Sequence, residues 1–293
     1  MIHKIHISAP AKINLSLRID DTELPHSLRN GTSLHKLEGV FLKIPLYDEI
    51  IVSKSPKKKI EIRYFGKFSK GIPNNSESIV FLAAKKFFQK IRFSEGISIA
   101  IEKNIPPSSG LGGASSDAAA VLKSLIELFS EQAQNIEQHH WREICLSLGS
   151  DVPFFFSPYT KANVSGHGEI CEEISDDDFS GKFISIAMLP KILCNTKWAY
   201  GELDAYRSLH KNTAEVINDF ELPIFAHFPD LKKLRDDFIS LDAKMSALTG
   251  SGSAIFAVFT TKEKALQAKK VLEPLCSFWK TVEIKKMPPV LSH

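Results

Sequence analysis

The segment IPPSSGLGGASSDAAAVLKSL, at residues 105–125, joins a proline pair to a glycine cluster, two serines and an apolar run with helical spacing. Just upstream, isoleucines alternate with smaller or polar residues over residues 97–101, which predicts a strand. Downstream, Ser115 or Ser116 is the expected N-cap of an amphipathic helix. The buried face of that helix is predicted at Ala118, Val121, Leu122, Leu125, Leu128 and Phe129. The chain must therefore turn from a strand into a helix through a segment with few side chains.

This loop has the properties of an anion-binding site. Its glycines, at positions 110, 112 and 113, let the backbone approach a ligand closely, and the following helix directs unpaired N–H groups to the same place. One helix end stabilises a fixed charge by only about 0.3 to 1 kcal/mol, so a polyphosphate needs several amides and hydroxyls together. Serines on both sides of the glycines supply hydroxyls. A plain tight turn is the alternative that spacing alone leaves open.

Two common phosphate-binding motifs do not describe this loop. No lysine follows the glycines as a P-loop requires, and Ser115 stands where a dinucleotide-binding fingerprint needs a third glycine. A second glycine-rich segment, TGSGS at residues 249–253, precedes the strand-like run AIFAVF. It predicts either a turn or a second close approach of the backbone to a substrate phosphate.

Length and composition leave room for two domains. The chain has 293 residues, 43% of them hydrophobic, and its net charge of +3 does not favour a nucleic-acid partner. No apolar run approaches the roughly 18 residues of a membrane span, and no signal-peptide pattern opens the chain. The four cysteines form no C-x-x-C pair, so neither a disulfide framework nor a zinc site is indicated. We expect a cytoplasmic protein with a small-molecule partner, no nucleic-acid or membrane partner, and a monomeric or weakly dimeric state.

The order of the predicted elements favours an α+β fold in two lobes. Apolar residues occupy alternate positions over residues 5–19, which predicts a strand interrupted near Pro10, and another strand is expected within residues 37–52. The pattern changes after residue 160, which predicts an N-terminal domain at 1–160 and a C-terminal domain at 161–293. Because strands and helices do not alternate regularly, a doubly wound sheet is not favoured. Other elements are expected at residues 141–148, 183–189, 229–241, 254–259, 262–275 and 282–284.

Four blocks of sequence, in their order and separations, resemble the GHMP kinase superfamily. They are PAKINLSLRI at 10–19, PPSSGLGGASSDAA at 106–119, GSDVPFF at 149–155 and LTGSGSAIFAVF at 248–259. The resemblance implies one lobe like ribosomal protein S5 domain 2 and a second, ferredoxin-like lobe, with ATP and substrate in the cleft between them. It also implies a branch that phosphorylates the tertiary 2-hydroxyl of a cytidine-diphosphate-linked methylerythritol, in the non-mevalonate route to isoprenoids.

The resemblance assigns roles at the matching positions, with Lys12 and Asp151 beside the acceptor hydroxyl. Aspartate is a weak base for an alcohol, because its unperturbed pKa is about 3.9. If phosphoryl transfer is largely dissociative, Asp151 need only orient the hydroxyl and accept its proton late. Lys12 then keeps Asp151 ionised and offsets charge on the moving phosphoryl group. Without the resemblance, an exposed ion pair or no pair would be the simpler reading. The residues implied to wrap the ATP phosphates are Pro106, Pro107, Ser108, Ser109, Gly110, Leu111, Gly112, Gly113, Ala114, Ser115 and Ser116.

The resemblance also implies a cytosine pocket. HKLEGVFLKIPLYDEI matches the family segment that begins with a base-reading histidine, which makes His35 the candidate. Leu34 stands where the family has a tyrosine, so one stacking ring is missing. Tyr200 falls at a second aromatic position and is predicted to stack on the base, which typically contributes about 1 to 3 kcal/mol. Trp198 is the nearby alternative, and core packing is the other role open to either ring.

The remaining contacts are assigned residue by residue. Asn14 shares a strand face with Lys12 and is a candidate for a substrate hydrogen bond. Gly250 and Ser251 are the candidates for the second backbone approach to substrate. ATP kinases use Mg²⁺, and no dedicated carboxylate cage is visible, so Ser116 is the predicted protein ligand. Ser78 replaces an asparagine that the family commonly carries near the nucleotide.

Two other functions stay open on the sequence alone. A different small-molecule GHMP kinase would keep the glycine loop and Asp151 but would not need the cytosine pocket. A nucleotide-binding regulator descended from a kinase would be favoured if Lys12 or Asp151 were replaced. Both residues are present.

Overall fold

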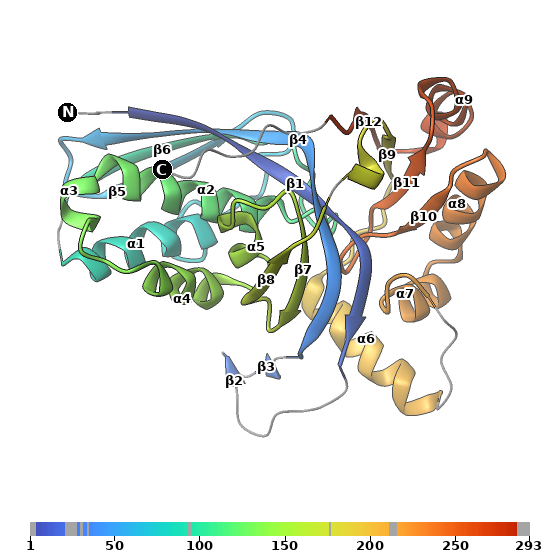
Figure 1. Ribbon diagram of the computed structural model, residues 1–293, viewed down its shortest axis with the longest axis horizontal. Helices are drawn as coiled ribbons and strands as arrows, with labels where there is room; N and C mark the ends of the chain where they lie inside the picture. Colours follow the sequence, from blue (N-terminus) through green and yellow to red (C-terminus); the bar gives the residue numbers. More distant parts are fainter. Residues whose placement is uncertain are drawn as a thin grey trace.

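The chain folds around two β-sheets in the computed structural model (Figure 1). None of its described helices is long and apolar enough to cross a membrane. All four cysteines are free. The structure describes residues 4–20, 28–29, 32–33, 35–92, 95–175, 177–210 and 216–285.

The first sheet carries the longest strands. Its strand order is β5-β6-β4-β7-β8, and β1 pairs antiparallel with β4. The strand predicted over residues 5–19 is confirmed, and its pairing register shifts between Pro10 and Ala11, where an interruption was expected. A separate two-stranded ribbon joins β2 (Leu28–Arg29) and β3 (Thr32–Ser33). The strands of the first sheet are β1 (Lys4–Ile19), β4 (Leu37–Ser55), β5 (Ile60–Phe65), β6 (Gly96–Glu102), β7 (Lys161–Gly166) and β8 (Ile170–Glu173).

Helices from the N-terminal half pack on this sheet. The apolar face predicted for the helix after the glycine loop is buried, in a core with β6 and with Trp141 of α4. The predicted N-cap is wrong, because the helix begins earlier and is preceded by Gly112, whose φ of 74° only glycine adopts readily. These helices are α1 (Ile79–Ile91), α2 (Gly113–Leu128), α3 (Ser130–Ala133), α4 (Gln138–Leu148) and α5 (Val152–Phe156).

The second sheet is antiparallel, with strand order β10-β11-β9-β12. The strands and helices predicted in this half of the chain are all present, with end residues that differ by a few positions. The strands are β9 (Phe183–Met188), β10 (Met245–Leu248), β11 (Ile255–Phe259) and β12 (Phe278–Glu283). The helices are α6 (Thr196–Leu209), α7 (Glu221–His227), α8 (Pro229–Ser240) and α9 (Lys262–Leu272), with short 3₁₀ turns η1 (Asp177–Phe179) and η2 (Glu273–Leu275).

The two lobes share long strands rather than a linker. In Figure 1, β1 and β4 run from the side of α1–α5 to the side of α6, and Leu17 and Phe41 share a core with Leu203 and Phe238. Strands β7 and β8 follow the boundary predicted at residues 160 and 161, yet β7 pairs with β4 in the first sheet. That boundary therefore cuts through a sheet. We propose that the division between domains falls between β8 and β9.

Candidate active site

The glycine loop exposes main chain because it leaves no room for a side chain at two of its glycines. Gly110 and Gly112 both have positive φ, 76° and 74°. A Cβ on Gly112 would lie 2.8 Å from the ring of Phe155. No side chain caps the start of α2, so the amides of its first turn stay available. The loop therefore offers backbone donors and a positive helix end, as an anion requires.

The second glycine segment holds this loop in place. The amide of Ser253 donates to the carbonyl of Ser108 at 3.3 Å, and that of Ala254 donates to Ser109 at 3.1 Å. A Cβ on Gly110 would lie 1.9 Å from the carbonyl oxygen of Thr249. The two segments thus meet backbone to backbone across the lobes, and Gly110 is required by this close approach.

Lys12 and Asp151 lie together, as the resemblance implied. The distance from Lys12 Nζ to Asp151 Oδ2 is 3.6 Å, and the same ammonium donates to Asn14 Oδ1 at 2.6 Å. Asn14 Oδ1 also accepts the amide of Gly250 at 2.7 Å. Asn14 is fully buried, so only its amide Nδ2, which has no partner among the described residues, is left for the predicted substrate contact. Its main observed role is to tie Lys12 to the second glycine segment.

The charge of Lys12 is poorly solvated. Burial lowers its pKa, and the attraction of Asp151 acts in the opposite direction without cancelling the burial. A nearby anion would raise the pKa of Lys12 again, because it would favour the charged ammonium. The site is therefore electrostatically prepared for a phosphate group.

One cavity of about 680 Å³ joins these features. The glycine loop, Lys12, Asp151 and Tyr200 all line it. Every loop residue predicted for ATP lines it except Leu111 and Ser116, and both second-segment candidates, Gly250 and Ser251, do so as well. Leu111 instead contributes a carbonyl that accepts the amide of Lys12 at 2.9 Å.

The two residues predicted for a base pocket, His35 and Tyr200, meet across the lobes, and of the two only Tyr200 lines the cavity. The rings of His35 and Tyr200 stack with centroids 5.0 Å apart, and Asp204 Oδ2 lies 3.5 Å from His35 Nε2. Burial raises the pKa of the Tyr200 hydroxyl, with smaller contributions from the Asp151 and Asp204 charges. Trp198 packs against His227 and Phe228 and does not line the cavity, which favours Tyr200 over Trp198. Leu34 lies outside the described residues.

A buried ionic cluster beside the loop was missed from the sequence. Lys103 Nζ contacts both Asp48 and Asp117, and all three side chains are almost completely buried. Burial, opposed by the attraction of Lys103 and aided by the neighbouring Asp48, raises the pKa of Asp117 to about 8. Lys103 and Asp117 line the cavity, so the cluster supports the loop from beneath. The only signal available in the sequence was their position, with Lys103 at the end of a predicted strand and Asp117 in the first turn of a predicted helix.

The residues around Ser116 fit a hard cation. Ser116 Oγ and Asp117 Oδ1 are buried and have no hydrogen-bond partner among the described residues. Oxygen atoms are the donors that Mg²⁺ prefers. Ser78, by contrast, is already used, since it caps α1 and bonds to Tyr64 at 2.9 Å.

Comparison with known proteins agrees with this geometry. A model of the GHMP kinase N-terminal domain matches residues 78–158, and one of the GHMP kinase C-terminal domain matches residues 203–280. A protein of Chloroherpeton thalassium named 4-diphosphocytidyl-2-C-methyl-D-erythritol kinase is 33% identical over 276 residues, covering 88% of this chain and 90% of that protein. The chain belongs to the GHMP kinases, in the 4-diphosphocytidyl-2-C-methyl-D-erythritol kinase family.

Solved structures of GHMP kinases share its fold. A crystal structure of 4-(cytidine 5'-diphospho)-2C-methyl-D-erythritol kinase matches with a TM-score of 0.69 and 25% identity, covering 95% of this chain and 98% of that one. The mevalonate kinase of Methanococcus jannaschii matches with a TM-score of 0.65 at 15% identity, over 97% of this chain and 99% of that one, which shows a common fold. The two-lobed α+β GHMP kinase fold predicted from the sequence is confirmed.

Proposed function

We propose that the protein transfers the γ-phosphoryl group of ATP to the 2-hydroxyl of 4-diphosphocytidyl-2-C-methyl-D-erythritol, in the non-mevalonate route to isoprenoid precursors. The observation that carries the proposal is the shared cavity, in which the glycine loop, the Lys12–Asp151 pair and Tyr200 face the same space. The names of the curated relatives support the choice of substrate.

In the proposed reaction, the loop amides and the start of α2 hold the ATP phosphates. The substrate hydroxyl oxygen attacks the γ-phosphorus, the bond to the β-phosphate oxygen breaks, and ADP leaves. Asp151 orients the hydroxyl and takes its proton as the new bond forms. Lys12, held by Asn14, offsets negative charge on the phosphoryl group during transfer.

Mg²⁺ would be held by Ser116, with Asp117 beside it, and by the phosphates themselves. The bound ion would supply neutralisation of the phosphate charge. Ser116 as its ligand stays a prediction, as do the cytoplasmic location and the monomeric or weakly dimeric state.

A kinase acting on another small alcohol is the second candidate, since it would use the same loop and the same Lys12–Asp151 pair. The aromatic ring of Tyr200, which lines the same cavity as Asp151, favours a substrate with an aromatic base. CDP should therefore compete with the substrate. Absence of competition would favour the second candidate.

The direct test is ADP release from ATP and Mg²⁺ with the cytidylated methylerythritol substrate. The wild type should release ADP only when this substrate is present. Asp151→Asn should keep its affinity for ATP and lose about 10²- to 10⁴-fold in kcat, the usual contribution of a positioned acid or base. If the wild type releases no ADP above background, the kinase assignment is wrong.

A further inference from the structure

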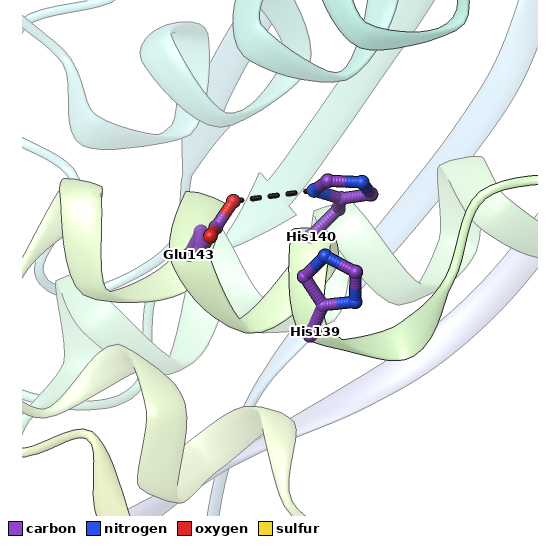
Figure 2. A group of neighbouring side chains, drawn as sticks. All are labelled: His139, His140 and Glu143. Atoms are coloured by element: carbon purple, nitrogen blue, oxygen red, sulfur yellow. Dashed lines mark hydrogen bonds and ion pairs between the residues drawn. The ribbon is translucent and has the colours of Figure 1, made fainter.

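Helix α4 carries a group of metal-ligating side chains that the kinase reaction does not use. His139, His140 and Glu143 project from its first turns, and Figure 2 shows the two imidazole rings side by side with the carboxylate next to His140. Each offers one donor atom, and these atoms all lie within 4.8 Å of one another. None of the three residues lines the active-site cavity.

The local geometry suits a shared metal ion. The two ring centroids are only 3.8 Å apart, so ring nitrogens of both residues can reach one ion. The distance from His140 Nδ1 to Glu143 Oε2 is 3.2 Å, close to the separation of two ligands on one metal ion with bonds of about 2.0 to 2.2 Å. A neutral histidine can bind a metal with one ring nitrogen while the other is held by a carboxylate. Glu137 Oε2 lies 3.1 Å from His139 Nδ1 and provides such a carboxylate.

The charges around the group decide whether a cation is tolerated there. The positive end of α4 and the side chain of Arg142 disfavour a cation. Glu137 and Glu143 offset both, and the donor side chains are 34% to 70% exposed, so they can rotate the short distance needed for coordination.

We infer that His139, His140 and Glu143 form a surface binding site for one divalent transition-metal ion of the Zn²⁺ class, with Glu137 orienting His139. Imidazole nitrogens with a carboxylate favour Zn²⁺, Cu²⁺ or Ni²⁺ over Mg²⁺, which prefers oxygen ligands throughout. The site is therefore distinct in chemistry from the Mg²⁺ expected with ATP. It occupies the first half of α4, whereas the turn that carries Asp151 follows the other end of this 11-residue helix, which is about 16 Å long.

Zinc titration of the full chain by calorimetry tests the inference without reference to kinase activity. The wild type should bind one Zn²⁺ at this site, and His140→Ala and Glu143→Gln should each weaken binding at least tenfold. His6→Ala is the matched control, because His6 faces a single carboxylate, Glu49, at 3.4 Å; it should bind as the wild type does. Mg²⁺ should not displace the Zn²⁺.

A second measurement separates loss of the site from loss of folding. Without metal, Glu143→Gln should unfold at the temperature of the wild type, because its side chain is 70% exposed, and His140→Ala should unfold close to it, because its side chain is 34% exposed. With excess Zn²⁺ the wild type and His6→Ala should gain thermal stability by mass action, and His140→Ala should gain less. The inference is overturned if the wild type shows no saturable Zn²⁺ binding, or if His140→Ala and Glu143→Gln bind Zn²⁺ as tightly as the wild type.

Discussion

The glycine loop and the predicted base pocket are built from different parts of the chain. The loop exposes main chain held against a second backbone segment, with glycines at 110 and 250 where a Cβ would collide with that backbone. The predicted base pocket consists of the side chains of His35, Tyr200 and Asp204, each of which a single substitution can change. This difference fits a family in which phosphate binding is shared and the acceptor varies. The two departures from the family pattern named above, at Leu34 and Ser78, likewise replace side chains and leave the glycines of the loop unchanged.

The largest effect is expected from adding one methyl group to the loop. Gly110→Ala requires a left-handed residue and places Cβ 1.9 Å from a carbonyl oxygen, so the two glycine segments must separate. We expect at least a hundredfold loss of ATP affinity and a destabilisation of more than about 3 kcal/mol. Calorimetric ATP titration and urea unfolding measure the two quantities.

Gly181→Ala is the control for the loop substitution. Gly181 has a similar φ of 72°, and a methyl group there would have no atom within 4 Å, so only the backbone cost of about 1 to 2 kcal/mol applies. If both variants lose the same stability and both keep ATP affinity, the close backbone approach is not what the loop depends on.

A buried lysine behind α5 should affect stability without affecting either ligand. Lys43 Nζ donates to the carbonyl of Ser157 at 2.8 Å, and burial lowers its pKa to about 7. The unfolded chain holds the proton up to a pKa of about 10.4, so wild-type stability gains from this group as pH rises above 7. Lys43→Met removes that dependence. Relative to wild type, Lys43→Met should therefore be more stable at pH 6 than at pH 9, by roughly 2 to 3 kcal/mol in the free energy of unfolding.

Urea unfolding at the two pH values measures this difference, and CDP and ATP titrations show whether the ligand sites are altered. A relative stability that does not change with pH would mean that Lys43 keeps an ordinary pKa in the folded protein.

Removing the stacking ring of the base pocket should act on one substrate alone. Tyr200→Ala should raise the KM for the cytidylated substrate by about five- to 150-fold, since base stacking contributes about 1 to 3 kcal/mol. The KM for ATP should stay within twofold. Tyr200→Phe keeps the ring and should behave as the wild type. Steady-state kinetics measure both KM values. An equal rise in the KM for ATP and the KM for the cytidylated substrate would mean that Tyr200 supports the structure of the whole cavity.

The smallest effect is expected at Asp204. Its carboxylate is 54% exposed and lies 3.5 Å from His35, so the pair contributes only about 0.2 to 1 kcal/mol. Asp204→Asn should raise the KM for the cytidylated substrate two- to fivefold, in a way that fades as salt is added. In a chain that already carries His35→Ala, the same substitution at Asp204 should cause no further rise in KM. If Asp204→Asn still raises this KM in the absence of His35, the effect of Asp204 does not depend on its contact with His35.

Local patterns predicted much of the fold, and family motifs supplied the candidate site residues. The alternation over residues 5–19 and the spacing after the glycines are short-range signals, and both strand and helix are present. Lys12 and Asp151 came from motifs that match a family, and the structure places them 3.6 Å apart.

The features that were missed depend on contacts distant in sequence. The pairing of β7 with β4 moves residues 161–166 into the first sheet, which no local pattern near residue 160 indicates. The Lys103 cluster joins Asp48, 55 residues away, to Asp117, and a charged residue read alone is normally assigned to the surface. The N-cap was wrong because serine is the usual capping residue, whereas here a left-handed glycine opens the helix toward the cavity.

The hydrogen bond between Asn14 and Gly250 spans 236 residues of chain. A ribosome adds about 5 to 20 residues per second, so about 12 to 47 seconds separate the synthesis of its two halves. Throughout that interval the strand that bears Lys12 has emerged without the segment that orients the lysine. The side of the cavity that residues 250–252 line is therefore completed only after most of the chain has been translated.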